Sequence, residues 1–228
     1  MSRPLRIQYP GAVYHIMNRG RARQPTFVDE TDYRAFLETL AEAHRQWGIE
    51  MFAYCLMGNH YHLCLRTPMG NLSRIMRHVD GIYTQRFNRR HRRDGTLFRG
   101  RYKGILIDAD EYLAAVVRYI HLNAVEAGLV KMPEEYRWAS HQFYLKAKGT
   151  PGWLDTKEAI EQIFIGIDED GLIAAPKQCP IAPMAPVESL GIDSIDVAHD
   201  PGEVSVRSSK TQMIVISHQG VGKHLHAP

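Results

Sequence analysis

Residues 49–67 read IEMFAYCLMGNHYHLCLRT and decide the fold, because they predict two antiparallel β-strands joined by a tight turn. Residues 49–57 form the earlier strand and residues 61–67 the later one. Gly58 and Asn59 stand between them, and such a pair is typical of a two-residue hairpin. The stretch therefore places a β-hairpin in the middle of the predicted domain.

The later strand divides its side chains between two faces, since successive residues of a strand point in opposite directions. The apolar face carries Tyr61, Leu63 and Leu65. His60, just before the strand, and His62 then share the other face. Two imidazoles in this i, i+2 pattern can bind one metal ion, but they can equally be polar residues on the wet face of a half-buried strand.

The flanking sequence predicts an α+β domain. Apolar periodicity indicates a strand over residues 12–19, helices over residues 30–47 and 72–91, and a fourth strand over residues 101–107. A third helix follows and ends near Gly128. The order β-α-β-β-α-β is that of the ferredoxin-like arrangement, an antiparallel sheet with helices on one face. We expect the other face of the sheet to be open for a nucleic-acid strand.

The third helix contains the segment RYIHLN, residues 118–123. Tyr119 and Asn123 are four residues apart, so they lie about 40° from each other around the helix axis and can both face the sheet. Tyr119 is a candidate nucleophile, although a tyrosine at a helix edge is often only amphipathic packing. Tyr112 lies two turns earlier on the same line and is the rival nucleophile, but it has no asparagine at the fourth position after it.

Two imidazoles and one amide oxygen would leave coordination positions open for water and phosphate oxygens. Such a site, made by His60, His62 and Asn123, suits Mg²⁺ or Mn²⁺. The ion would polarise a scissile phosphate that Tyr119 attacks.

Charge is distributed unevenly along the 228 residues. Residues 1–103 contain 18 Lys and Arg against 8 Asp and Glu, a net charge of +10, whereas the remainder has a net charge of −7. Residues 86–103 are the most basic segment, with eight basic residues and one acidic residue. Interleaved arginine and aromatic residues favour a nucleic-acid contact over a merely solvated helix end. The predicted DNA-binding residues are Arg89, Arg90, Arg92, Arg93, Phe98, Arg99, Arg101, Tyr102 and Lys103.

Other features of the sequence set limits. It contains no apolar stretch long enough to span a membrane and no signal-peptide core, and its three cysteines are too few for a disulfide framework. We therefore expect a cytoplasmic protein. Residues 1–155 form the predicted domain, and residues 156–228 form a C-terminal extension, partly disordered and of unknown role. We expect residues 171–201 to be poorly ordered and residues 212–217 to form an isolated strand.

Five segments together resemble one protein family: residues 10–20, 57–65, 97–108, 110–130 and 136–145. They are similar to the REP-associated tyrosine transposases, which belong to the HUH single-tyrosine transposases of insertion sequences. The resemblance covers residues 5–155.

The resemblance implies a ferredoxin-like fold, His60 and His62 as the histidines of the histidine-hydrophobe-histidine motif, and Tyr119 as the nucleophile. It also implies cleavage of single-stranded DNA beside palindromic hairpins through a 5′-phosphotyrosine link, in DNA transposition and recombination. Asn123 stands where this branch of the family has asparagine and many insertion-sequence relatives have glutamine. Tyr61 is bulkier than the usual aliphatic residue between the histidines, and Ala124 replaces a proline that is usual in relatives.

Three functions fit these observations. The first is a metal-dependent transposase that cleaves and rejoins single strands. The second is a hairpin-DNA-binding protein of the same fold that does not cleave, and the third is a metal nuclease that uses water instead of a tyrosine. The sequence leaves open whether the protein is a monomer or a homodimer.

Overall fold

The computed structural model describes residues 6–107, 109–146 and 149–164, together with four C-terminal strands. Residues 6–173 form one compact unit, and the C-terminal strands belong to a second unit. Two short 3₁₀ helices of the first unit are Arg21–Arg23 and Pro133–Glu135. Its longer elements are β1 (Ala12–Arg19), α1 (Glu30–Trp47), β2 (Glu50–Met57), β3 (His60–Thr67), α2 (Leu72–His91), β4 (Lys103–Ile107), α3 (Ala109–Glu126), α4 (His141–Leu145) and α5 (Lys157–Phe164).

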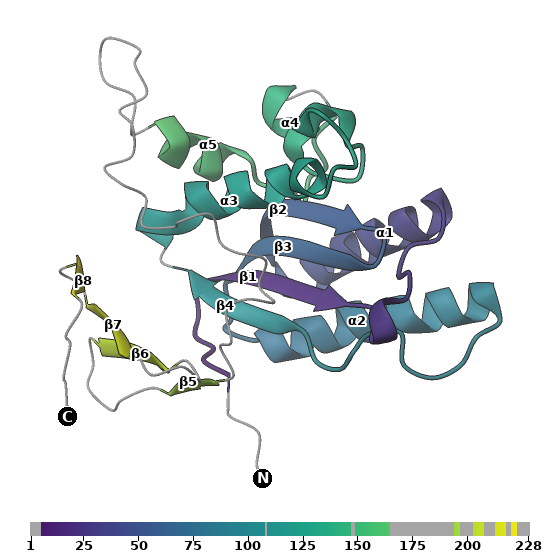
Figure 1. Ribbon diagram of the computed structural model, residues 1–228, viewed down its shortest axis with the longest axis horizontal. Helices are drawn as coiled ribbons and strands as arrows, with labels where there is room; N and C mark the ends of the chain where they lie inside the picture. The colour runs from purple at the N-terminus through teal and green to yellow at the C-terminus, as the bar shows by residue number, and fades with distance from the viewer. Residues whose placement is uncertain are drawn as a thin grey trace. The chain divides into compact units, whose positions relative to one another are not determined.

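The four strands form one antiparallel sheet in the order β2-β3-β1-β4 (Figure 1). This order and the succession β-α-β-β-α-β confirm the predicted ferredoxin-like α+β fold. Met57 pairs with His60, so the hairpin turn consists of Gly58 and Asn59, as predicted. The two central strands, β3 and β1, are the ones that carry the histidines of the site described below.

Helix α1 has the ends that its sequence predicts. The Asp29 carboxylate accepts a hydrogen bond from the backbone N–H of Thr31 at 2.9 Å, which satisfies one of the unpaired donors of the first turn. Gly48 ends the helix with φ of 63°, a left-handed conformation that costs glycine little. The helix therefore spans Glu30–Trp47, the range expected from the sequence.

The sheet has a hydrophobic cluster on each face. On one face, the α1 and α2 side chains Phe36, Leu40 and Val79 belong to the same buried cluster as Tyr61 and Leu63. On the other face, the buried cluster includes side chains of β1, β2, β3 and α3, namely Val13, Cys55, Cys64, Leu113, Val117 and Ile120.

The second cluster corrects the expectation of an open sheet face. Helix α3 contacts β2 and β3, and α5 packs beside it (Figure 1). The reason is the apolar stripe of α3, since Leu113, Val117 and Ile120 are buried only when this helix covers the sheet. A nucleic-acid strand must therefore reach this face around α3, because the helix occupies part of it.

The C-terminal unit contains a second antiparallel sheet. Its strands are β5 (Ser194–Asp196), β6 (Glu203–Arg207), β7 (Met213–Ser217) and β8 (Gly220–Gly222), in sequence order. The strand expected within residues 212–217 is thus not isolated, because β7 pairs with β6 and with β8. Residues 171–201, expected to be poorly ordered, lie outside the described residues except for β5.

A search of the described helices found none whose length and apolar character would let it cross a lipid bilayer.

Candidate active site

Strand β3 presents its two histidines on the face that α3 covers. Tyr61, between them, is fully buried in the cluster beneath α1 and α2. Strand alternation therefore turns His60 and His62 to the opposite face, as the sequence predicts. His62 is buried and His60 is half-buried, and their ring centroids are 5.2 Å apart.

A third histidine, His15 of β1, completes this group and was not predicted as a site residue. Its Nε2 lies 3.0 Å from Nδ1 of His62, and the two rings are stacked with centroids 5.2 Å apart. His15 pairs with Cys64 in the register of β1 with β3, which puts it on the same face as His62. The signal that could have found it is the alternation of residues 12–19, in which Val13, His15 and Met17 share one face.

Tyr119 of α3 lies against this pair of imidazoles. Its ring meets that of His15 edge to face at a centroid distance of 5.7 Å, and that of His62 at 5.8 Å. Tyr119 is half-buried at the margin of the cluster that anchors α3, as predicted for a residue at the edge of the apolar stripe. The structure therefore joins the two sequence signatures, GNHYHLCLR and RYIHLN, in one place.

Asn123 lies one turn beyond Tyr119 and is buried. Its side-chain N–H donates to the backbone carbonyl of Tyr119 at 2.8 Å, which ties the amide to that turn of the helix. Among the described residues, it has no hydrogen bond to His60 or His62. The structure thus pairs Asn123 with Tyr119, and its role as a metal ligand stays a prediction.

Burial controls the protonation of this group. Desolvation lowers the pKa of His15 to about 4 and that of His62 well below its usual value, and it also lowers the pKa of His60. All three imidazoles are therefore neutral at pH 7 and keep a lone pair. Desolvation raises the pKa of the Tyr119 phenol, and its hydrogen bond with the Asn123 side chain acts in the opposite direction.

The hydrogen bonds indicate which nitrogen of each imidazole is free. Nδ1 of His60 lies 2.7 Å from Oδ1 of Asn59, an acceptor, so Nδ1 carries the proton and Nε2 keeps its lone pair. If Nδ1 of His62 donates to Nε2 of His15, the Nε2 atom of His62 is free in the same way. Asn59 and His15 are thus the hydrogen-bond partners of the two predicted metal ligands, His60 and His62.

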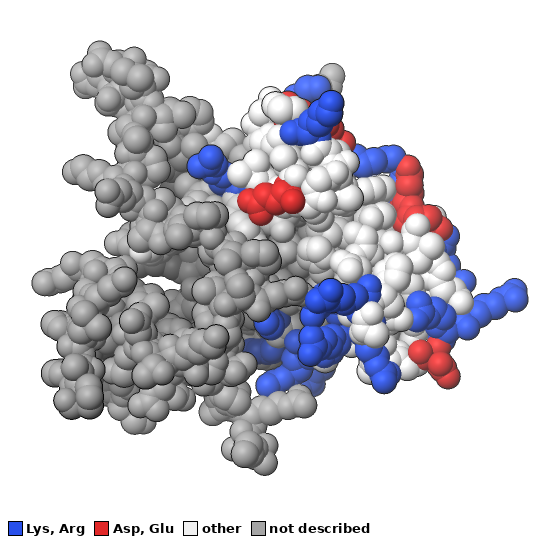
Figure 2. Space-filling view, viewed as in Figure 1, with Lys and Arg blue, Asp and Glu red and all other residues white. Residues whose placement is uncertain are grey.

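The basic segment gathers Lys and Arg side chains over β4 and the chain that leads into it (Figure 2). Arg89, Arg92, Arg99, Arg101 and Lys103 are exposed, and none has a hydrogen bond or ion pair from its side chain to another described residue. Within the described part of the chain, these five cations can therefore meet a phosphate backbone without first breaking a contact.

Arg90 and Arg93 are engaged within the protein. Arg90 forms ion pairs with Asp29 at 2.5 Å and with the buried Asp32 at 2.9 Å, so it joins the end of α2 to the start of α1. Arg93 donates to the side chain of Gln24. The DNA contact predicted for Arg90 thus conflicts with two ion pairs that the structure already shows.

The two aromatic residues predicted to stack on bases are in the core. Phe98 and Tyr102 are each 5% exposed and belong to the cluster beneath α1 and α2. The Arg6 guanidinium covers the Tyr102 ring at 3.6 Å. Neither ring offers a free face for a base, which corrects the expectation drawn from their place among arginines.

A comparison with protein families gives the class of the protein. A family model described as "Transposase IS200 like" matches residues 8–123, just over half of the chain. The chain belongs to this family and is a DNA transposase, an enzyme of DNA transposition. A search of curated proteins gave no match.

Solved structures support the same fold. The chain is similar to a REP-associated tyrosine transposase bound to a REP hairpin, with 19% identity, a TM-score of 0.57, and coverage of 68% of this chain and 93% of that one. The resemblance read from the sequence is therefore confirmed at the level of family and fold.

Two further structures are more distant. A candidate transposase from Deinococcus radiodurans R1 has 21% identity, a TM-score of 0.38, and coverage of 52% of this chain and 94% of that one. The tRNA(His) guanylyltransferase of Saccharomyces cerevisiae has 10% identity, a TM-score of 0.36, and coverage of 99% and 93%. At these TM-scores neither similarity is evidence about function.

Proposed function

We propose that this transposase cleaves single-stranded DNA through a covalent bond to Tyr119. The observation that carries the proposal is the contact of the Tyr119 ring with two neutral imidazoles, those of His15 and His62. Tyr112 lies two helical turns, about 10.5 Å, away along α3. Tyr119 is therefore the tyrosine that the fold joins to the histidine pair.

The proposed step is a transfer of the DNA phosphate to tyrosine. The Tyr119 hydroxyl loses its proton, and its oxygen forms a bond to phosphorus as the bond from phosphorus to the 3′ oxygen breaks. The products are a 5′-phosphotyrosine link and a free 3′-hydroxyl, and reversal with a second 3′-hydroxyl rejoins strands. Burial raises the pKa of the Tyr119 phenol, and the Asn123 side chain offsets part of that rise.

The residues around Tyr119 fit a divalent cation. Nε2 of His60 and Nε2 of His62 are available as neutral donors, and Asn123 offers an amide oxygen within one helical turn of the nucleophile. Mg²⁺ or Mn²⁺ bound there would withdraw charge from the scissile phosphate, and imidazole ligands favour Mn²⁺. His15 and Asn59 would hold the ligand rings in their orientation.

The proposed substrate is single-stranded DNA that adjoins a palindromic hairpin. The structural relative described above was solved with a REP hairpin bound, and the present chain shares its fold. The five exposed cations, which extend from the last turn of α2 to the first residue of β4, supply a surface for the phosphates of such a hairpin. Positive charge there would retain the duplex part while the single strand extends to Tyr119.

One experiment distinguishes this function from its two alternatives. The full chain is mixed with Mn²⁺ and an end-labelled hairpin with a single-stranded flank, and the products are separated on a denaturing gel. A covalent protein–DNA band in the wild type, absent from Tyr119→Phe, is the expected result. Cleaved DNA without a covalent band would indicate a metal nuclease that uses water, and a shift seen only in native gels would indicate a protein that binds hairpins without cleaving them.

A further inference from the structure

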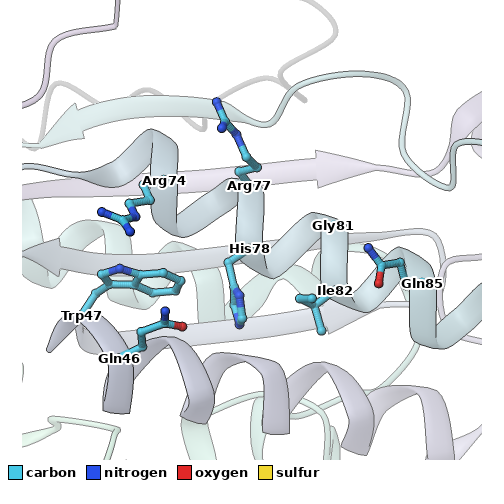
Figure 3. Close-up of a pocket in the computed structure, with 8 residues that line it drawn as sticks. All are labelled: Gln46, Trp47, Arg74, Arg77, His78, Gly81, Ile82 and Gln85. Carbon is cyan, nitrogen blue, oxygen red and sulfur yellow. The ribbon is translucent and has the colours of Figure 1, made fainter.

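A groove lies between α1 and α2, on the helical layer that faces away from the histidine pair (Figure 3). It is a shallow groove, largely open to solvent, with a volume of about 310 Å³. Its lining residues are Gln46 and Trp47 of α1 and Arg74, Arg77, His78, Gly81, Ile82 and Gln85 of α2.

The groove is basic and contains an aromatic ring. No carboxylate is among its lining residues, whereas Arg74 and Arg77 are both exposed. The guanidinium of Arg74 extends beside the Trp47 indole, and Arg77 points away from α1 at the rim (Figure 3). Neither arginine side chain has a hydrogen bond or ion pair to another residue in the described part of the chain. An unpaired guanidinium beside an indole suits a group that carries both a planar ring and a negative charge.

Other arginines of α2, closer to its C-terminal end, have a structural role because they contact α1. Arg86 of α2 donates to Thr39 at 2.8 Å and pairs with Glu42 at 2.6 Å, both on α1. Arg90 pairs with Asp29 and Asp32. The arginines near the C-terminal end of α2 thus hold the two helices together, whereas Arg74 makes no such contact. Helix packing therefore explains Arg86 and Arg90, and it leaves Arg74 available for a ligand.

Gly81 is an independent observation that points to a ligand. It lies in the interior of α2, where glycine costs about 1 kcal/mol relative to alanine. A Cβ atom built on Gly81 would meet nothing within 4 Å, so packing within the protein does not require glycine at this position. Because Gly81 lines the groove, a methyl group there would enter space that a closely approaching ligand would use.

His78 adds an unused polar atom. Its Nε2 is buried and has no hydrogen-bond partner among the described residues, and Oε2 of Glu42 is 3.7 Å away. That distance is too long for a hydrogen bond. The His78 ring also meets the Trp47 ring edge to face at 4.9 Å, so it helps to fix the indole that borders the groove.

We infer that this groove binds one nucleotide of the DNA, with its base against Trp47 and its phosphate on Arg74. The inference rests on the proposed function, because that function makes DNA the source of the nucleotide. It places this DNA contact on the face of the sheet opposite the nucleophile. Tyr61 of β3 faces the α1–α2 layer, whereas His62 and Tyr119 lie on the other face of the sheet. The bound nucleotide is therefore remote from the scissile phosphate, and the DNA reaches two faces of the domain.

The test measures affinity and stability together in single variants of the full chain. In anisotropy titrations with a labelled hairpin that has single-stranded flanks, Arg74→Ala weakens binding about tenfold, the loss expected for one charge-assisted hydrogen bond. Gly81→Ala weakens it about fivefold, equivalent to about 1 kcal/mol. The same Gly81→Ala change raises the melting temperature by about 2–4 °C, because alanine is the better helix former.

Arg34→Ala is the matched control. It removes one exposed arginine of α1 whose partner is Glu30, one helical turn away, and we expect its DNA affinity to stay within about twofold of wild type because surface pairs of this kind contribute little. If Gly81→Ala stabilises the protein and leaves affinity unchanged, the groove binds no DNA and the inference is wrong. If dAMP or dTMP alone binds the groove while Arg74→Ala has wild-type DNA affinity, the site takes free nucleotides and the inference also fails.

A failure of the proposed function would look different. The control variant Arg34→Ala forms the covalent adduct at the wild-type rate, because Arg34 lies outside the groove and on α1, away from Tyr119. Absence of the adduct from wild type would contradict the proposed function. The affinity measurements would still decide whether the groove binds DNA.

Discussion

The two faces of the sheet use the same strands for different purposes. Beneath α1 and α2, β3 contributes Tyr61, Leu63 and Leu65 to a continuous apolar core. Beneath α3, the same strand contributes His60, His62 and Cys64, and buried imidazoles take the place of part of that core. Neighbouring residues of the strand therefore differ in role: one side chain stabilises the fold, and we propose that the next acts on DNA. The apolar face thus supplies the stability that permits buried polar groups on the other.

The largest effect is expected from removing a proposed metal ligand on the α3 face. His62→Ala lowers the rate of adduct formation by about 10³-fold, since it removes a proposed metal ligand and the partner of His15. His60→Ala has a similar effect on the rate, with a smaller effect on stability because its side chain is half-buried. Adduct formation on denaturing gels and thermal melts measure the two effects. Wild-type rates in both variants would remove these histidines from the site.

A core substitution on the opposite face should have the reverse effect. Leu40→Ala empties part of the cluster beneath α1 and α2, where Leu40 is fully buried, and costs about 2–5 kcal/mol of unfolding free energy. Because Leu40 is on α1, the adduct rate at a temperature where the variant is folded stays close to wild type. Urea denaturation gives the free energy. Loss of adduct formation without a lower unfolding free energy would contradict the proposed separation of roles between the two faces of the sheet.

Acidic pH should weaken the fold through the α3 face. Burial lowers the pKa of His15 from 6.5 to about 4, so the unfolded chain binds this proton more readily than the folded one. Its contribution to stability is complete above pH 6.5 and is lost as the pH falls toward 4, by up to about 3 kcal/mol. The unfolding free energy of wild type should therefore fall more steeply over this range than that of His15→Gln. Parallel curves for the two proteins would contradict the assignment.

His15 itself should act on metal binding through His62. His15→Ala removes the hydrogen-bond partner that orients His62 and lowers Mn²⁺ affinity about 10–100-fold. His15→Gln keeps a side-chain oxygen that can accept from Nδ1 of His62, so it should recover part of that loss. Calorimetric titration with Mn²⁺ measures all three proteins. Equal affinities in the alanine and glutamine variants would show that His15 only fills space.

The smallest effect concerns the basic segment. Replacing Arg89, Arg92 and Arg99 with alanine should flatten the dependence of log affinity on log salt by about 0.7–0.9 for each phosphate released. Arg90→Ala is the contrast, because that guanidinium is paired with Asp29 and Asp32. We expect it to lower the melting temperature and leave the slope unchanged. An unchanged slope in the triple variant would mean that these arginines are only solvated.

Local patterns were sufficient to predict most of the fold. The bounds of β1, α1 and α2 follow from periodicity, and those of the other elements of the sheet and α3 differ by a few residues at most. The orientation of His60 and His62 to one face of β3 and the position of Tyr119 at the edge of the apolar stripe of α3 also follow, because each depends only on the geometry of one strand or one helix.

The remaining features depend on contacts between distant segments. His15 joins the site because β1 pairs with β3, and its own segment contains no second polar ligand to mark it. Phe98 and Tyr102 were assigned to the surface because they stand among arginines, but apolar burial governs their position. Helix α3 covers the histidine face because its apolar stripe is buried there. No local sequence pattern identifies the surface on which that stripe packs.

The most direct test of the central claim is to identify the residue that carries the DNA. The wild-type chain reacts with a hairpin substrate and Mn²⁺, nucleases trim the bound strand, and mass spectrometry of the proteolysed adduct locates the added nucleotide. We expect the nucleotide on Tyr119, bound through its 5′ phosphate. A nucleotide on Tyr112 or on any other residue would contradict the proposed function.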